Sequence, residues 1–128
     1  NIEYKIEETP EYIEVVVTGK GAEKLIGYRG ESLNALQTIL TAIINKENNS
    51  DVKVILDIEN YKNARKKTLE ELSEKIEKTV TKTGKTITLE PMTAYERKII
   101  HTKLQDSRTV KTYSIGENDR RRVVIAKK

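Results

Sequence analysis

The sequence predicts an α+β protein in which two small halves are joined through a long helix. Several short segments carry apolar residues at every second position, which is typical of strands with one buried face. In 31–45 and 61–83 apolar residues recur every three or four positions instead, which is the period of an amphipathic helix. The predicted order is strand, strand, short helix, helix and strand over 1–60, then helix, strand, helix, strand and strand over 61–128.

The first half begins with two alternating segments separated by Thr9-Pro10, which favours a hairpin or two neighbouring strands. Asn48-Asn49-Ser50 has the residues of a turn, so the preceding helix should end before it. The expected elements are strands at 2–6 and 13–17, a short helix at 22–26, a helix from Glu31 to about Asn45, and a strand at 52–58.

The second half begins with the long helix, which should stop at Gly84 because glycine is favoured just after a helix. Thr93 and Glu96 fit a capping box at the start of a second helix, worth on the order of 1 kcal/mol. The expected elements are a helix from Tyr61 to about Thr83, a short strand at 87–89, a helix from Ala94 to about Leu104, and strands at 110–115 and 121–126.

At 128 residues the chain suits one ordinary domain or two very small ones that share a core. It contains no cysteine, which excludes disulfides and thiolate metal sites and favours a reducing, cytoplasmic compartment. No apolar run approaches the roughly 18 residues of a membrane span, and no signal-peptide pattern opens the chain. Because the first residue is Asn1 and not Met, we expect a fragment of a longer protein that lacks an N-terminal part.

The net charge of +4 conceals opposite charges on the two halves. Residues 1–60 contain six Lys and Arg against eleven Asp and Glu, a net of −5, whereas residues 61–128 contain eighteen against nine, a net of +9. A positive field of this kind favours an acidic polymer as the partner, with ordinary solubility as the alternative. The absence of Phe and Trp argues against a single-strand binding surface built from paired aromatic rings.

Gly27-Tyr28-Arg29-Gly30 interrupts the helical pattern just before the helix expected at Glu31. Glycine adopts positive φ without steric cost and lets a ligand backbone approach closely. The N-terminus of the following helix offers amide groups and the positive end of a dipole, which suits a nucleic-acid phosphate. The same spacing also occurs in plain turns between helices, so both interpretations stay open. The motif lacks the Lys-Ser/Thr ending of a nucleotide phosphate loop.

Arg97 and His101 are four residues apart on the expected helix, so their side chains rise from one face. Arginine offers a rigid fork of donors to a phosphate, and histidine can donate one ring N–H or stack on a base or sugar. The structural alternative is that Arg97 caps a sheet edge or pairs with a nearby acid, and that His101 is a surface residue whose hydrogen bonds are satisfied within the fold. If the last hairpin packs beside the helix, further basic residues would converge on the same surface: Lys103, Arg108, Lys111, Arg120, Arg121 and Arg122. Basic residues at an exposed strand can also serve only to discourage aggregation.

The sequence predicts no catalytic residue, metal site or cofactor. One His, no Cys and no Ser in a nucleophile-elbow context leave no triad to assemble, and metal-ligand spacing is absent. A phosphate-handling enzyme that uses Arg97 and His101 is the least favoured alternative.

Two motifs resemble known domains. The segment Leu25–Leu33, between two helices and followed by a strand at 52–58, resembles a KH domain of the bacterial type II. Arg97-Lys98-Ile99-Ile100-His101, placed before a final pair of strands, resembles the R-three-H domain, named for an Arg and a His separated by three residues. This order, with Asp57–Tyr61 at the junction, is similar to the bacterial Jag family, whose members carry a further N-terminal domain. The resemblance covers essentially the whole chain.

The resemblance implies a KH-like domain at 1–60 and an R-three-H domain at 61–128, with the helix 61–83 shared at the junction. It implies a cytoplasmic, non-catalytic regulatory protein that binds single-stranded RNA, with single-stranded DNA as an open alternative, and that is linked to cell elongation and envelope synthesis. It also implies two kinds of protein partner, a small KH-only protein and the membrane-insertase machinery.

The Gly-x-x-Gly turn of KH domains clamps about four nucleotides, and it maps here onto Gly27, Tyr28, Arg29 and Gly30. Relatives usually carry two basic residues inside this turn. Tyr28 occupies one of those places, which weakens the phosphate grip or replaces part of it by stacking. In the second domain, Arg97 and His101 are the residues that the motif carries over, whereas Arg120 to Arg122 depend on the charge argument alone.

A protein-interaction adaptor is the competing hypothesis. In that case the Gly-x-x-Gly turn and its helices form a dimer surface, and nucleic-acid binding is vestigial. The acidic first half favours this alternative, and it leaves a homo-oligomer open.

Overall fold

The structure is a computed structural model that describes all residues, 1–128, and it separates into two compact units, Asn1–Arg65 and Lys66–Lys128. The first unit contains β1 (Ile2–Glu8), β2 (Tyr12–Gly19), α1 (Glu31–Asn48), β3 (Lys53–Ile58) and the start of α2 (Tyr61–Thr83). The second contains the rest of α2, β4 (Ile87–Thr88), α3 (Ala94–Leu104), β5 (Val110–Ile115) and β6 (Arg122–Lys127). Single 3₁₀ turns complete the chain: η1 (Ala22–Leu25), η2 (Tyr28–Gly30) and η3 (Asn118–Arg120). The predicted α+β class and element order are confirmed.

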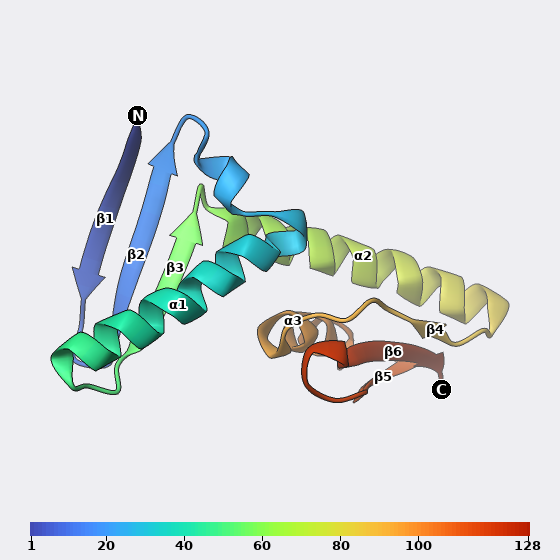
Figure 1. Ribbon diagram of the computed structural model, residues 1–128. Coiled ribbons are helices and arrows are strands. Elements are labelled where there is room, and N and C mark those ends of the chain that lie inside the picture. Colours follow the sequence, from blue (N-terminus) through green and yellow to red (C-terminus); the bar gives the residue numbers. More distant parts are fainter. The chain divides into compact units, whose positions relative to one another are not determined.

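The first unit is a mixed three-stranded sheet with α1 across one face (Figure 1). The strand order is β1-β2-β3, in which β1 and β2 form the predicted antiparallel hairpin and β3 pairs in parallel with β2. The register places Val15 opposite Leu56 and Val17 opposite Ile58, so alternate residues of both strands share the face under α1. Leu33 of α1 is 1% exposed and packs in this core.

The helix α1 ends at Asn48 and not near Asn45, so the expected helix end was placed too early. Asn45 is still helical, and its side chain accepts from the Val52 amide at 2.8 Å and donates to the Val52 carbonyl at 2.9 Å. Asn49, with φ +48, provides the left-handed residue that stops the helix. The predicted turn residues do end the helix, but Asn48, the first of them, still belongs to the last helical turn.

The second unit is an antiparallel sheet of order β4-β6-β5 with α2 and α3 packed on the same face. The alternate residues Val123 and Ile125 of β6 are fully buried against both helices. The predicted capping box is confirmed at the start of α3, where the Thr93 hydroxyl accepts from the Glu96 amide at 3.3 Å and the Glu96 carboxylate accepts from the Thr93 amide at 3.4 Å. This cap fixes the residue at which α3 begins.

The helix α2 has the predicted bounds, Tyr61–Thr83, and the division between the two compact units lies inside it, after Arg65. Tyr61 packs against the buried cluster of the first unit, whereas Leu69, Ile76 and Val80 belong to the core of the second. The same helix therefore supplies apolar side chains to both cores.

Candidate nucleic-acid interface

The Gly-x-x-Gly turn lies between η1 and α1, and both glycines have backbone angles that side chains rarely adopt. Gly27 has φ +73 and Gly30 has φ +80. A Cβ at Gly27 would collide with the Ser32 side chain, and a Cβ at Gly30 would lie 2.8 Å from Cε2 of Tyr61. Both positions therefore require glycine for the close packing of the turn as well as for its conformation.

The turn delivers the chain directly into the N-terminus of α1. Gly30 is the cap residue of this 18-residue helix, and no side chain caps it. The Gly30 amide donates to the Gly27 carbonyl at 3.3 Å, and the Leu33 amide donates to the Ile26 carbonyl at 3.1 Å. These bonds hold the turn against the positive end of the α1 dipole, an arrangement that favours an approaching anion.

Tyr28 and Arg29, the two residues inside the turn, contact each other. Tyr28 is 65% exposed, and the Arg29 guanidinium carbon lies 5.0 Å from the centroid of its ring, within the range of a cation–π contact. Arg29 itself has φ +53, a left-handed conformation that is uncommon outside glycine. The turn therefore presents one cation and one aromatic ring together, which suits a phosphate and an adjacent base.

Arg97 and His101 lie on α3 as predicted, and both are half-buried. Nη1 of Arg97 donates to the Met92 carbonyl at 2.7 Å, which fixes the guanidinium against the segment before the helix. Both ring nitrogens of His101 have partners on β5: Nδ1 is 2.7 Å from Oγ1 of Thr112, and Nε2 is 2.9 Å from Oγ of Ser114. His101 thus joins α3 to β5, and its ring nitrogens are already used within the fold.

The charge state of His101 follows from its surroundings. Burial, with smaller contributions from Arg97 and Arg121, holds the pKa of His101 below its ordinary value. The ring is therefore neutral at pH 7, and the positive charge at this place comes from the two arginines. His101 holds α3 against β5, while Arg97 and Arg121 supply the positive charge around it.

The three consecutive arginines do not share one environment. Arg121 donates from Nη1 to the Gly116 carbonyl at 2.8 Å and lies near enough to His101 to affect its pKa. Arg122 pairs with Ile115 in the register, one residue past Ser114, so it lies on the opposite face of the sheet. Arg120 is exposed at the end of η3. Within this unit, the structure brings Arg97, His101 and Arg121 together and leaves Arg122 apart from them.

Lys103 does not join this group either. Its Nζ forms an ion pair with the Glu74 carboxylate of α2 at 2.9 Å, on the side of α3 that faces that helix. The expectation that Lys103 converges with the other basic residues is therefore wrong, because an acid of the neighbouring helix neutralises it.

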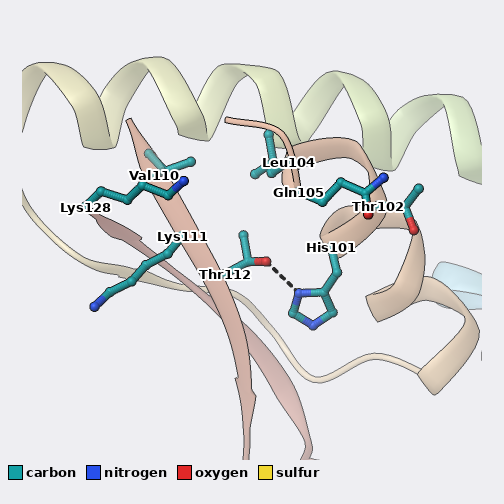
Figure 2. Close-up of a pocket in the computed structure, with 8 residues that line it drawn as sticks. All are labelled: His101, Thr102, Leu104, Gln105, Val110, Lys111, Thr112 and Lys128. Atoms are coloured by element: carbon teal, nitrogen blue, oxygen red, sulfur yellow. Dashed lines mark hydrogen bonds between the residues drawn. The ribbon is translucent and has the colours of Figure 1, made fainter. Parts of the chain in front are cut away.

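A hollow of about 410 Å³ lies beside His101, between the end of α3 and the start of β5 (Figure 2). Its lining combines hydroxyl, amide and ammonium groups around an apolar base: His101, Thr102, Leu104, Gln105, Val110, Lys111, Thr112 and Lys128. Lys111, which the sequence analysis named, is part of this lining, although its side chain is on the face of β5 opposite Thr112. The sequence analysis did not identify Thr112 and Ser114 as the partners of His101. Their alternation on β5 places both on one face, but only the packing of α3 shows that this face meets His101.

The structure contains no group of three or more His, Cys, Asp or Glu residues able to hold a metal ion. No helix in it combines the length and the apolar character needed to cross a bilayer.

Two protein-family models match the chain, one for each motif. Residues 1–58 match the family described as KhpA/KhpB, KH domain, and residues 67–127 match the family of the R-three-H domain. The fold and the two motifs therefore define a protein with a KH domain followed by an R-three-H domain.

The chain is also similar to relatives named RNA-binding protein KhpB. It is 41% identical to the relative from Clostridium symbiosum over 128 residues, 100% of this chain and 57% of the relative. It is 42% identical to the relative from Bacillus subtilis (strain 168) over 125 residues, 96% of this chain and 60% of the relative. The predicted resemblance to the bacterial Jag family is therefore confirmed, because the chain matches both domain families in that order and relatives at 41% and 42% identity carry the name KhpB. The chain spans about three fifths of the length of these two relatives.

Proposed function

We propose that this chain binds single-stranded RNA through surfaces in both units and that it does so without catalysis. The observation that carries the proposal is the Gly27–Gly30 turn, in which Arg29 lies over the exposed ring of Tyr28 at the N-terminus of α1. The name of these relatives, RNA-binding protein KhpB, supports RNA as the ligand. Single-stranded DNA is the alternative ligand, and the same binding assay separates the two.

The two units supply different parts of this interaction. We assign the KH-like function to residues 1–60 and the R-three-H function to residues 61–128, with the helix 61–83 common to both. The first half has a net charge of −5, so its turn holds phosphates mainly by dipoles and by Arg29. The second half has a net charge of +9, with Arg97, His101, Arg120, Arg121 and Arg122 as its candidate residues. Most of the salt-dependent affinity should come from this half.

Titration of a fluorescently labelled single-stranded RNA of random sequence, followed by anisotropy at two salt concentrations, tests the proposal. If about five phosphates are neutralised, log K falls against log salt with a slope of about −3.5. Arg29→Ala and Arg97→Ala should each weaken binding. Lys46→Ala, which removes one exposed charge at the opposite end of α1, is the matched control and should bind almost as the wild type does. Wild-type protein that binds neither RNA nor DNA would refute the proposal.

A surface for other proteins is the second candidate function, and exposed apolar residues of the first unit favour it. On α1, Leu36 is 38% exposed, Ile39 56% and Ile43 53%. On the edge strand β1, Ile2, Tyr4 and Ile6 are each more than half exposed. Exposed apolar groups of this size commonly mark interaction sites. The partners that the resemblance implies are a small KH-only protein, the membrane-insertase machinery and a second copy of this chain.

Sedimentation of the purified chain, alone and mixed with a KH-only protein, tests this second function. Ile39→Glu should abolish any association, whereas Glu47→Gln, near the end of the same helix, should not. If the chain sediments as a monomer both alone and in the mixture with the KH-only protein, the adaptor hypothesis is refuted.

We further propose a regulatory role in the cytoplasm, linked to cell elongation and envelope synthesis as the resemblance implies. Crosslinking the protein to RNA in cells, followed by sequencing of the attached RNA, tests this role. The Arg29→Ala, Arg97→Ala double variant is the control, and equal RNA recovery from both proteins would count against it.

A further inference from the structure

The sheet of the second unit has one face packed against helices and one face that these helices leave open. Thr112 and Ser114 of β5 point toward His101 on the helix face. Because side chains alternate along a strand, Lys111, Tyr113 and Ile115 lie on the opposite face. Tyr113 is 45% exposed and Ile115 is 43% exposed. The open face therefore displays an aromatic ring that the core does not use.

The Tyr113 side chain lies beside a buried apolar residue and near two cationic ones. In the register, Tyr113 lies opposite Val124, which is only 3% exposed. Lys111 lies two residues along the same strand, about 7 Å from Tyr113. Arg122 lies opposite Ile115, on the face of the sheet away from His101. The Tyr113 ring thus lies between Lys111 and Arg122 on one face of the sheet.

The charge of this part of the chain indicates what the surface would bind. The three strands of this sheet contain Lys111, Arg122 and Lys127 and no Asp or Glu. The acids Glu70 and Glu74 are on α2, which packs on the opposite face of the sheet. A positive face with an accessible ring suits an unpaired polynucleotide, because every base can stack on a ring and every nucleotide carries a phosphate.

We propose that this open face is a further RNA-contacting surface, on which an unpaired base stacks on the Tyr113 ring while neighbouring phosphates contact Lys111 and Arg122. The proposal rests on the proposed RNA binding. It extends that binding to the face of the sheet away from Arg97 and His101. Because β5 is an edge strand, the face that carries Tyr113 and the face that contacts His101 meet at its free edge.

The test compares three tyrosine variants in the anisotropy titration with labelled single-stranded RNA. Tyr113→Val removes the ring but keeps a residue that favours strands, and it should weaken binding by about five- to hundred-fold. Tyr113→Phe keeps the ring and should bind like the wild type. Tyr95→Ala is the matched control, because Tyr95 is 58% exposed on α3 but lies two positions from Arg97, on another side of the helix.

Ultraviolet crosslinking of the wild-type complex, followed by mass spectrometry, provides a readout that does not depend on the stability of a variant. The nucleotide adduct should map to the peptide that contains Tyr113. If Tyr113→Val binds like the wild type and no adduct maps there, while Arg97→Ala still weakens binding, the open face is not used and the proposed function stands. If the wild type binds no RNA, both fail together.

Discussion

Replacing Gly30 by alanine is expected to destabilise the first unit by about 2–5 kcal/mol, the sum of two costs. Alanine in the left-handed conformation of Gly30, φ +80, costs about 1–2 kcal/mol. A Cβ at this position would lie 2.8 Å from Cε2 of Tyr61, and relief of such overpacking costs about 1–3 kcal/mol. Tyr61 packs against the buried cluster that includes Leu33 and Ile58, so its ring cannot turn aside without losing those contacts.

Gly21 provides a matched control within the same unit. It also precedes a helical turn with a left-handed backbone, φ +89, but a Cβ there would meet nothing within 4 Å. Gly21→Ala should therefore show only the backbone cost, about 1–2 kcal/mol. The difference between the two variants isolates the contact with Tyr61.

Native-state hydrogen exchange of the β2 and β3 amides measures this difference, because it reports the opening of the first unit separately from the second. In a Tyr61→Leu background, the cost of Gly30→Ala should fall toward that of Gly21→Ala, which makes a double-mutant cycle. Equal losses for Gly30→Ala and Gly21→Ala in the wild-type background would refute the packing argument. If the argument holds, glycine substitutions in this turn disturb folding as well as binding, and changes at Tyr28 and Arg29 are the cleaner tests of RNA contact.

Three further predictions concern the second unit. Thr93→Ala should lower the unfolding free energy by about 1 kcal/mol in urea denaturation, because it removes the capping box of α3. Folding lowers the pKa of His101, so the stability that the neutral ring contributes is complete above the ordinary histidine pKa and is lost as the pH falls through the folded-state pKa. His101→Gln should therefore make the midpoint of urea unfolding less dependent on pH between about pH 7.5 and about pH 5.5. Lys103→Ala should leave the midpoint almost unchanged, because its ion pair with Glu74 lies at the surface, and a large loss would show that this pair is more than a surface contact.

Local chemistry allowed much of the fold to be predicted from the sequence. The bounds of α2 followed from its periodicity and from Gly84, and the start of α3 followed from Thr93 and Glu96. Each of these features depends on residues within one or two helical turns of one another. The end of α1 was placed too early because a run of turn residues does not show which of them is the last helical one.

The candidate site was harder to predict from the sequence because its key contacts join segments that are far apart along the chain. The spacing of Arg97 and His101 predicts a shared helix face, but it cannot show that the ring of His101 is held by two hydroxyls of β5. Nor can sequence proximity show that Arg121 lies near His101 while Arg122 lies on the other face of the sheet, since that depends on where β6 begins. Packing and register, which are tertiary properties, decide both points.

These contacts change the part that each motif residue plays. A histidine whose two ring nitrogens are bonded within the fold, and whose protonation is disfavoured, contributes little charge to a polyanion at neutral pH. The spacing of Arg97 and His101 is then explained by geometry: His101 fixes α3 on β5, and this holds Arg97 at a set distance from the sheet. The positive charge that remains is carried by arginines, such as Arg97 and Arg121. Between about pH 6 and about pH 8, RNA affinity in this half should therefore respond to salt far more than to pH.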